Sequence, residues 1–189
     1  MSETIDVFEA IRSRRSIGRL KDHAVEDKLI HEILEAGNWA PSHHGTEPWR
    51  FYVMTGDGRN VLADAYGDIA VEAAGETPVD REKHRAKAFR APLVIAVAVS
   101  PSPAPRVVRA EELAAAQAAV QNMLLAAHAL GLAAIWRSGE PMYHSRMQAA
   151  FELAEEEELV ALLYIGEPDM VPPQGKRRPY EEKTTWLRS

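Results

Sequence analysis

Three arginines and two serines are adjacent near the start of the chain, in the order Arg12-Ser13-Arg14-Arg15-Ser16. Guanidinium groups bind phosphate oxygens in pairs and serine hydroxyls add further hydrogen bonds, so this cluster could bind a dianionic phosphate. The same residues could also form a basic turn at the end of a helix, where cations are favoured in any case. The residues alone leave both interpretations open.

A second stretch, residues 39–51, combines aromatic, imidazole and polar side chains with two prolines and a glycine. A proline-stiffened loop of this kind, leading into a strand, is typical of a site for a planar ligand, and Trp39 and His43 are its candidate contacts. The adjacent His43 and His44 also raise the possibility of a metal site. We predict no metal, because neighbouring residues in an extended backbone point apart and no carboxylate stands at a ligand spacing.

The third candidate stretch, Trp136-Arg137-Ser138, follows a long apolar segment. Residues 111–130 predict a helix that is apolar almost all round, and such a helix is buried on most sides, in a core or between two subunits. Residues 132–136 then predict a short buried strand. A buried helix and strand that end in polar side chains form a frame for a ligand site.

Composition and charge limit the kind of protein this is. The 189 residues suit one domain, residues 1–189, and the net charge of -6 argues against nucleic acid as the main partner. The absence of cysteine excludes thiol catalysis and disulfides, and a reducing cytoplasm is the simplest location. The N-terminus lacks the pattern of a signal peptide, and no apolar run is long enough to predict a membrane span.

The remaining elements are predicted from periodicity and breaker residues. Thr4 can cap a first helix, and Gly56-Asp57-Gly58 begins like a dinucleotide-binding motif but has Val61 in place of its third glycine, so we predict a tight turn into a helix. Further helices are predicted at 25–36, 61–74, 81–90 and 142–153, and strands at 51–54, 93–99 and 159–165. Residues 81–90 could attract a nucleotide phosphate through their charge, but we interpret them as a solvated helix face, and we interpret 155–158 as a solvated acidic turn. Helices and strands do not alternate regularly, which favours an α+β sheet sandwiched by helices.

The last segment, residues 168–189, is rich in proline and predicted to be extended. It carries the basic run Lys176-Arg177-Arg178 and ends with Trp186 and Leu187. A tail of this kind has little core of its own, so its apolar residues imply docking on this subunit or on a partner.

Taken together and in order, these residues resemble the flavin-dependent nitroreductase family, and within it the small bacterial single-domain members. The resemblance covers most of the chain and rests on Arg14-Arg15-Ser16, Ala40-Pro41-Ser42, Glu47-Pro48-Trp49-Arg50-Phe51, Ala91-Pro92-Leu93-Val94-Ile95, the helix from Gln121 to Leu132 with Trp136, and Tyr164-Ile165-Gly166 with the basic tail. It implies a nitroreductase-like α+β fold, with a central, mostly antiparallel sheet flanked by helices and a C-terminal tail that extends onto a dimer partner.

The resemblance also implies a function. Members of the family bind FMN at the interface of a homodimer and pass a hydride from NADH or NADPH through the flavin to a nitroaromatic, a quinone or a similar acceptor, by a ping-pong mechanism. Because the cofactor carries this chemistry, no residue is expected to act as a catalytic nucleophile or general acid.

The cofactor contacts implied by the resemblance come from four places. Arg14, Arg15 and Ser16 are expected on the phosphate and ribityl chain, with Lys176 and Arg178, or Arg177 between them, joining them from the tail. Trp39 and His43 are expected to reach the flavin from the other subunit, and Trp136, Arg137 and Ser138 are expected to line the isoalloxazine ring.

The chain departs from the commoner family pattern at Gly45 and Glu47, where many relatives have Asn and Gln, and at the two histidines before them. Three alternatives stay open at this point. One is a relative that acts on reduced flavin itself, another is a flavin-holding or sensing protein without nicotinamide turnover, and the third is an interaction protein with a purely structural helical dimer core.

Overall fold

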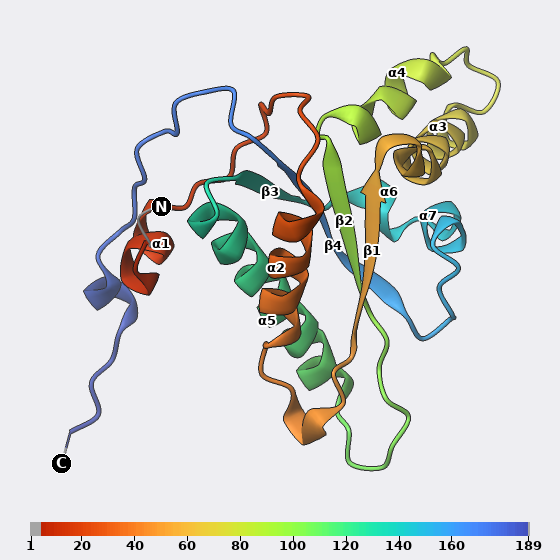
Figure 1. Cartoon of the computed structure of the whole chain (residues 1–189). Coiled ribbons are helices and arrows are strands. Elements are labelled where there is room, and N and C mark those ends of the chain that lie inside the picture. The colour runs from red at the N-terminus through yellow and green to blue at the C-terminus, as the bar shows by residue number, and fades with distance from the viewer. Residues whose placement is uncertain (1–4, 189) are drawn as a thin grey trace.

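The computed structural model describes residues 5–188 and is built on one antiparallel sheet (Figure 1). Its strands are β1 (Trp49–Thr55), β2 (Leu93–Val99), β3 (Ala133–Arg137) and β4 (Glu158–Gly166), and they lie in the order β1-β2-β4-β3. All three pairings are antiparallel, with β2 and β4 in the centre and β3 at one edge. The predicted α+β class and the antiparallel sheet are confirmed.

Helices cover both faces of the sheet (Figure 1). On one face lie α2 (Asp27–Asn38) and α5 (Arg109–Ala129); on the other lie α3 (Asn60–Ala74), α6 (Glu140–Tyr143) and α7 (Ser145–Ala150). The remaining helices are α1 (Val7–Ser13), α4 (Arg81–Arg85) and the short 3-10 turns η1 (His43–Gly45), η2 (Gly56–Arg59), η3 (Ala86–Phe89) and η4 (Tyr180–Lys183).

Two predicted helices begin or break differently from expectation. The carboxylate of Asp6 accepts from the backbone N–H groups of Phe8 and Glu9 and so caps α1, whereas the predicted cap, Thr4, lies outside the described residues. The helix expected over 142–153 is interrupted at His144, which is extended (φ -74°, ψ 143°) and whose ring accepts from the N–H of Arg146. This second cap ends α6 and starts α7.

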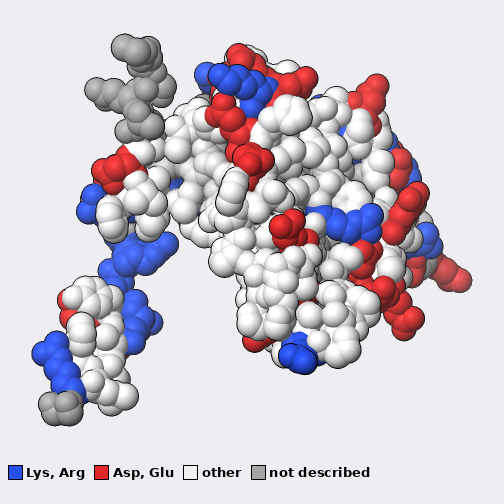
Figure 2. Space-filling model, turned by 60° about the horizontal axis from the view of Figure 1, so that its bottom comes forward, with Lys and Arg blue, Asp and Glu red and all other residues white. Residues whose placement is uncertain are grey.

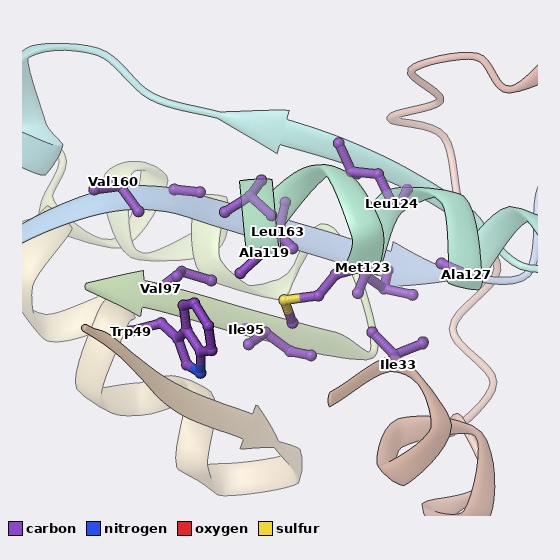
Figure 3. Close-up of a cluster of buried hydrophobic side chains, with 14 of the residues drawn as sticks. Ile33, Trp49, Ile95, Val97, Ala119, Met123, Leu124, Ala127, Val160 and Leu163 are labelled. Carbon is purple, nitrogen blue, oxygen red and sulfur yellow. The ribbon is translucent and has the colours of Figure 1, made fainter. Parts of the chain in front are cut away.

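The core on the α2 and α5 face is filled mainly by small and aliphatic side chains (Figure 3). Met123 of α5 lies between the sheet and α2, next to Ile33 and Ile95. A Cβ on Gly37 would lie 2.8 Å from Cγ of Met123, so the glycine lets α2 approach α5 closely. This packing fixes α5 against the sheet, and α5 positions both candidate ligand regions.

α5 is buried on one side only. Ala115, Ala116 and Ala119 are buried against the sheet, whereas Ala114 and Gln117 are exposed along the opposite side. Within this chain, α5 is therefore buried on one side and exposed on the other, whereas burial on most sides was expected. No helix among residues 5–188 combines the length and the apolar character that crossing a bilayer demands.

The acidic run at 155–158 is not simply a solvated turn. Glu157 is only 5% exposed and both of its carboxylate oxygens accept from Arg50, at 2.8 and 2.9 Å. It also accepts from the N–H of Ala154 at 3.0 Å. The prediction was wrong for this residue because a carboxylate with these donors can be buried, and it ties β1 to the start of β4.

The C-terminal segment leaves the body of the molecule, as predicted for a tail without its own core (Figure 1). Its first part follows the segment after α1, since the N–H of Asp169 donates to the carbonyl of Arg19 and Leu20 pairs with Pro168. Beyond residue 175 the side chains are exposed, including Trp186 at 66% and Leu187 at 93%. Figure 2 shows that Lys and Arg side chains line this projecting segment.

Candidate functional site

Cations from both ends of the chain meet beside the end of α1. Arg15 donates from Nη1 to the carbonyl of Arg12 (2.7 Å) and from Nε to the carbonyl of Pro173 in the tail (3.2 Å). The tail backbone passes so close that a Cβ on Gly175 would overlap the Arg15 guanidinium. The tail therefore passes directly beside the N-terminal arginines within one chain.

This cluster, formed by Arg14, Arg15 and Arg177, has an uncompensated positive charge. Burial lowers the pKa of Arg14, and the charges of Arg15 and Arg177 lower it further. The neighbouring arginines form ion pairs, Arg12 with Glu9 and Arg19 with Asp169. The described residues give Arg14 and Arg15 no such carboxylate partner. Such a cluster is stabilised by a bound anion, and guanidinium groups suit a phosphate.

A cavity of about 160 Å³ opens beside these arginines. Its lining is Ser13, Arg14, Arg15, Ile17, Leu124, His128, Gly131, Leu132, Ala133, Ala134, Pro168 and Pro172. The Ser13 hydroxyl donates to the carbonyl of Glu9 and lies 2.7 Å from Nε2 of His128. Burial, together with the charges of Arg14 and Arg15, lowers the pKa of His128, so the imidazole is neutral at neutral pH.

Ser16 joins this cluster to the edge of the sheet. It forms an isolated parallel bridge with Ala134, and the N–H of Ile17 donates to the Ala134 carbonyl at 3.1 Å. Backbone groups alternate sides along a strand, so those of Trp136 point to the same open edge of β3. Ser16 itself is exposed.

Trp136 and Arg137 lie on opposite faces of β3, as consecutive strand residues must. Trp136 packs against the α5 side of the sheet. The Arg137 guanidinium lies 5.3 Å from the centre of the Tyr164 ring on the α3 side. Its Nε is buried and has no hydrogen-bond partner among residues 5–188, and its Nη2 would lie 3.1 Å from a Cβ placed on Gly18. The absence of a side chain at Gly18 thus leaves room for Arg137.

A second cavity, of about 220 Å³, contains this arginine and is rich in donors. It is lined by Tyr66, Lys87, Arg90, Arg137, Ser138, Gly139, Pro141, Met142, Leu162 and Tyr164. Tyr164 donates to Tyr66 at 3.4 Å, and burial raises the pKa of both hydroxyls, which keeps both protonated. As far as the described part of the chain shows, the lining contains cations and hydroxyls but no carboxylate, so it suits a ligand group that accepts hydrogen bonds.

Sequence reasoning missed four residues of this cavity. Lys87 and Arg90 belong to the stretch that was interpreted as a solvated helix face, and their spacing of three was the available signal that they share a side. Tyr164 belongs to a motif that carried the resemblance, but neither it nor Tyr66 gave a signal of a ligand contact, because an apolar helix or strand accommodates a tyrosine without any ligand.

The loop with Trp39 and His43 lies far from the arginine cluster within one chain. Nε2 of His43 is 3.9 Å from the carboxylate of Glu111 at the start of α5, whereas Ser13, next to the arginine cluster, contacts His128 near the end of that helix. These two helix positions are separated by roughly 26 Å of axis. Trp39 is 77% exposed, and its Nε1 donates to Glu35 at 2.7 Å. The two regions can share a ligand only if the loop comes from another copy.

Of the three tail cations, Arg177 is the one whose charge acts on Arg14. Lys176 and Arg178 are exposed and remain predictions as phosphate contacts. Among residues 5–188, no three His, Cys, Asp or Glu side chains are grouped as metal ligands would be.

Comparison with known proteins identifies the class to which this fold and this site belong. The sequence profile described as "Nitroreductase family" matches residues 11–167. The chain is 36% identical to "Putative NAD(P)H nitroreductase YdjA" of Escherichia coli K12, over 88% of this chain and 90% of that one. It is 30% identical to YfhC of Bacillus subtilis 168, which has the same designation, over 94% and 92%. The chain therefore belongs to the nitroreductase family of oxidoreductases.

Solved structures agree. The nitroreductase-like family protein of Bacillus cereus superimposes with a TM-score of 0.87 at 31% identity, over 100% of both chains. A nitroreductase-type protein of Desulfovibrio desulfuricans, whose structure was solved in complex with FMN, superimposes with a TM-score of 0.75 at 33% identity over 98% of both. The predicted nitroreductase-like fold is confirmed.

Proposed function

We propose that this chain is a homodimeric, FMN-dependent NAD(P)H oxidoreductase that passes a hydride through bound flavin to a nitroaromatic, a quinone or a similar acceptor, by a ping-pong mechanism. Each subunit would be one domain, residues 1–189, and a cytoplasmic location agrees with the absence of cysteine. The FMN-bound Desulfovibrio desulfuricans structure and the names of the E. coli and B. subtilis relatives support the cofactor and the hydride donor.

The residues present fit FMN. The arginine cluster of Arg14, Arg15 and Arg177 would hold the phosphate dianion, because it combines three cations with no internal acid. The donor-rich cavity would hold the carbonyl edge of the ring, and the buried, unpartnered Nε–H of Arg137 is the donor that most needs an acceptor there. The edge of β3 connects the two places.

The rest of the site would come from a second copy. A two-fold axis that sets two α5 helices antiparallel places the start of one beside the end of the other, and hence the Trp39 and His43 loop of each subunit beside the arginine cluster of its partner. The exposed side of α5 suits this contact. A hollow bounded by His43, Ala114 and Ala118 lies along it, and its alanines allow a close approach.

FMN, when bound, would supply the redox chemistry, which is hydride transfer from NAD(P)H to the second substrate. The residues of the chain would bind and orient the flavin and tune its reduction potential. Trp136 gives the edge of the slot an apolar wall, Ser138 and the backbone of β3 offer hydrogen bonds, and the positive charge of Arg137 favours negative charge on the ring edge. A mechanism in which the cofactor carries the redox chemistry needs no protein nucleophile.

The single observation that carries the proposal is the meeting of Arg14, Arg15 and Arg177 beside the open edge of β3. The test is the visible spectrum of the purified protein, mass spectrometry of whatever it releases on denaturation, and steady-state oxidation of NADH and NADPH with menadione and with a nitroaromatic. We expect a yellow protein that releases FMN and turns over. A colourless protein that takes up no FMN contradicts the proposal, and a yellow protein without turnover identifies a flavin holder instead.

A further inference from the structure

One carboxylate at the start of α5 is buried without a cation. Glu112 is 1% exposed, while its neighbour Glu111 is exposed and faces His43. The described residues provide Glu112 with hydrogen bonds but no ion pair. Its place in the first turn of a 21-residue helix favours negative charge, because the N-terminal end of the helix dipole is positive. Burying a charge is costly without strong hydrogen bonds, so the bonds of Glu112 show what it stabilises.

Both of those bonds go to loops rather than to the core. Oε1 accepts from the hydroxyl of Thr46 at 2.5 Å, and Oε2 accepts from the N–H of Ser102 at 3.0 Å. The bonds then continue into the loop: Oγ of Ser42 lies 3.2 Å from Oγ1 of Thr46 and accepts from the N–H of Glu47 at 2.9 Å.

The direction of this chain of bonds is fixed by proton counting. A hydroxyl has one proton, and that of Thr46 goes to the carboxylate at the shortest of its contacts. Ser42 must therefore donate to Thr46 and accept from the backbone. All donors point the same way and end on the negative charge, an arrangement in which each bond strengthens the next. The carboxylate thus acts on Glu47, two bonds beyond Thr46.

The loop needs such an anchor because its backbone is strained. His44 has φ 59° and Glu47 has φ 48°, both in the left-handed region that L-residues rarely adopt, and Gly45 between them has φ 63°. Strain at non-glycine residues persists only where surrounding bonds over-determine the conformation. Three such bonds join the four residues of the bonded chain, Glu112, Thr46, Ser42 and Glu47.

We propose that Glu112 is the positioning residue of this loop: it holds residues 42–47 in their strained conformation so that His43 projects toward the second subunit. The consequence for cofactor binding rests on the proposed function, but the anchoring itself does not. Glu112 does not touch the cofactor, and it acts through Thr46 and Ser42.

The anchoring is tested by hydrogen exchange at the Glu47 and Ser102 amides in matched variants of the whole 189-residue chain. Thr46→Val keeps the shape of the side chain and removes the donor, and Thr46→Ser keeps the donor. We expect Thr46→Val and Glu112→Gln to speed exchange at Glu47 by about tenfold or more, and Thr46→Ser to leave it near the parent rate. Unchanged exchange at Glu47 in both disrupting variants overturns the proposal.

The consequence is tested by the dissociation constants of FMN and riboflavin. A displaced loop weakens both ligands by a similar factor, about tenfold, because it does not reach the phosphate, so the ratio of the two constants stays at the parent value. A change in the ratio overturns this role for the loop. If no variant and no parent protein binds flavin, the proposed function fails, while the exchange result still decides whether Glu112 anchors the loop.

Glu157→Gln is the matched control. It also neutralises a buried carboxylate, but that carboxylate pairs with Arg50 of β1 and has no hydrogen bond to the loop of residues 42–47 among the described residues. It is expected to lower stability and to leave the Glu47 exchange rate and both flavin constants unchanged. If Glu157→Gln speeds Glu47 exchange as much as Glu112→Gln does, general destabilisation explains the effect and the positioning role is overturned.

Discussion

At the scale of single residues, Arg14 offers the most direct test of the phosphate assignment. Replacing it by alanine removes a charge-assisted contact whose loss typically weakens binding by roughly 10- to 100-fold. We expect Arg14→Ala to weaken FMN by this factor and to leave riboflavin, which lacks the phosphate, almost unchanged. Calorimetric titration of both ligands measures the difference.

The control for that variant is Arg12→Ala. Arg12 stands two positions away and is 71% exposed, with its side chain on Glu9. Equal losses from both variants would mean that general positive charge, rather than the partly buried Arg14, attracts the phosphate. Because the pKa of Arg14 is lowered only from a very high reference value, the residue stays cationic throughout the physiological range and no pH effect from it is expected there.

Arg137 is predicted to tune the electron affinity of the ring. Its positive charge stabilises the extra negative charge that reduction brings, so Arg137→Ala should lower the midpoint potential of bound flavin, by about 30 mV or more for a two-electron couple. Arg137→Lys should retain most of the parent potential. Spectroelectrochemical titration gives both values, and equal potentials for the alanine variant and the parent would remove Arg137 from this role.

At the scale of elements, a substitution at Gly37 tests how closely α2 must approach α5. A Cβ there would meet Cγ of Met123 at 2.8 Å and Cζ of Phe51 at 3.2 Å, so Gly37→Ala overpacks the interface and should cost about 1–3 kcal/mol of unfolding free energy. Alanine has the higher helix propensity, by about 1 kcal/mol, so a stabilised variant would show that the interface yields. Urea unfolding measures this, with Gly58→Ala as control, because a Cβ at Gly58 meets nothing within 4 Å.

The contact between β1 and β4 is predicted to depend on pH through Glu157. Burial alone raises the pKa of this carboxyl, but hydrogen bonds from Ser100, the Ala154 N–H and Arg50 outweigh it, so its pKa in the folded state is lowered. A lowered pKa stabilises the fold above the unfolded carboxyl value of about 4.3, and this stabilisation is lost as the pH falls through the folded value.

Glu157→Gln should therefore be less stable than the parent by about 2 kcal/mol at pH 7, and the gap should shrink below pH ~4. Urea unfolding at pH 7, 5 and 4 tests this. A gap that stays constant with falling pH would show that the loss comes from packing rather than from the ionised carboxylate.

At the scale of the whole molecule, we expect the tail to be needed for assembly and FMN binding but not for folding of the subunit. The side chains beyond residue 175 are exposed, so a chain that ends after Gly175 should keep the spectrum and secondary structure of a folded subunit. It loses Arg177 and the apolar Trp186 and Leu187, and we expect it to bind FMN at least tenfold more weakly and to dissociate more readily. Light scattering with FMN titration tests this, and an undiminished dimer with full FMN affinity would contradict it.

Much of this fold could be predicted from the sequence, since continuous apolar runs such as β2 and long amphipathic or apolar helices such as α5 have a strong local signal. The break at His144 and the buried Glu157 could not, because each depends on a hydrogen bond that the sequence does not reveal. In the candidate site, Arg14 and Arg15 had a signal through clustered charge. Tyr66, Tyr164 and Glu112 had none, because their partners are distant in sequence and only the folded sheet and loops bring them together.

The one-sided burial of α5 has a consequence for handling the protein. If a second copy covers this side of α5, as proposed, the melting temperature should rise with protein concentration, by mass action. Cofactor seated at that boundary would be shed on dilution, so specific activity measured at very low enzyme concentration would fall below the value measured in concentrated stock, and adding free FMN to the assay would restore only part of the loss.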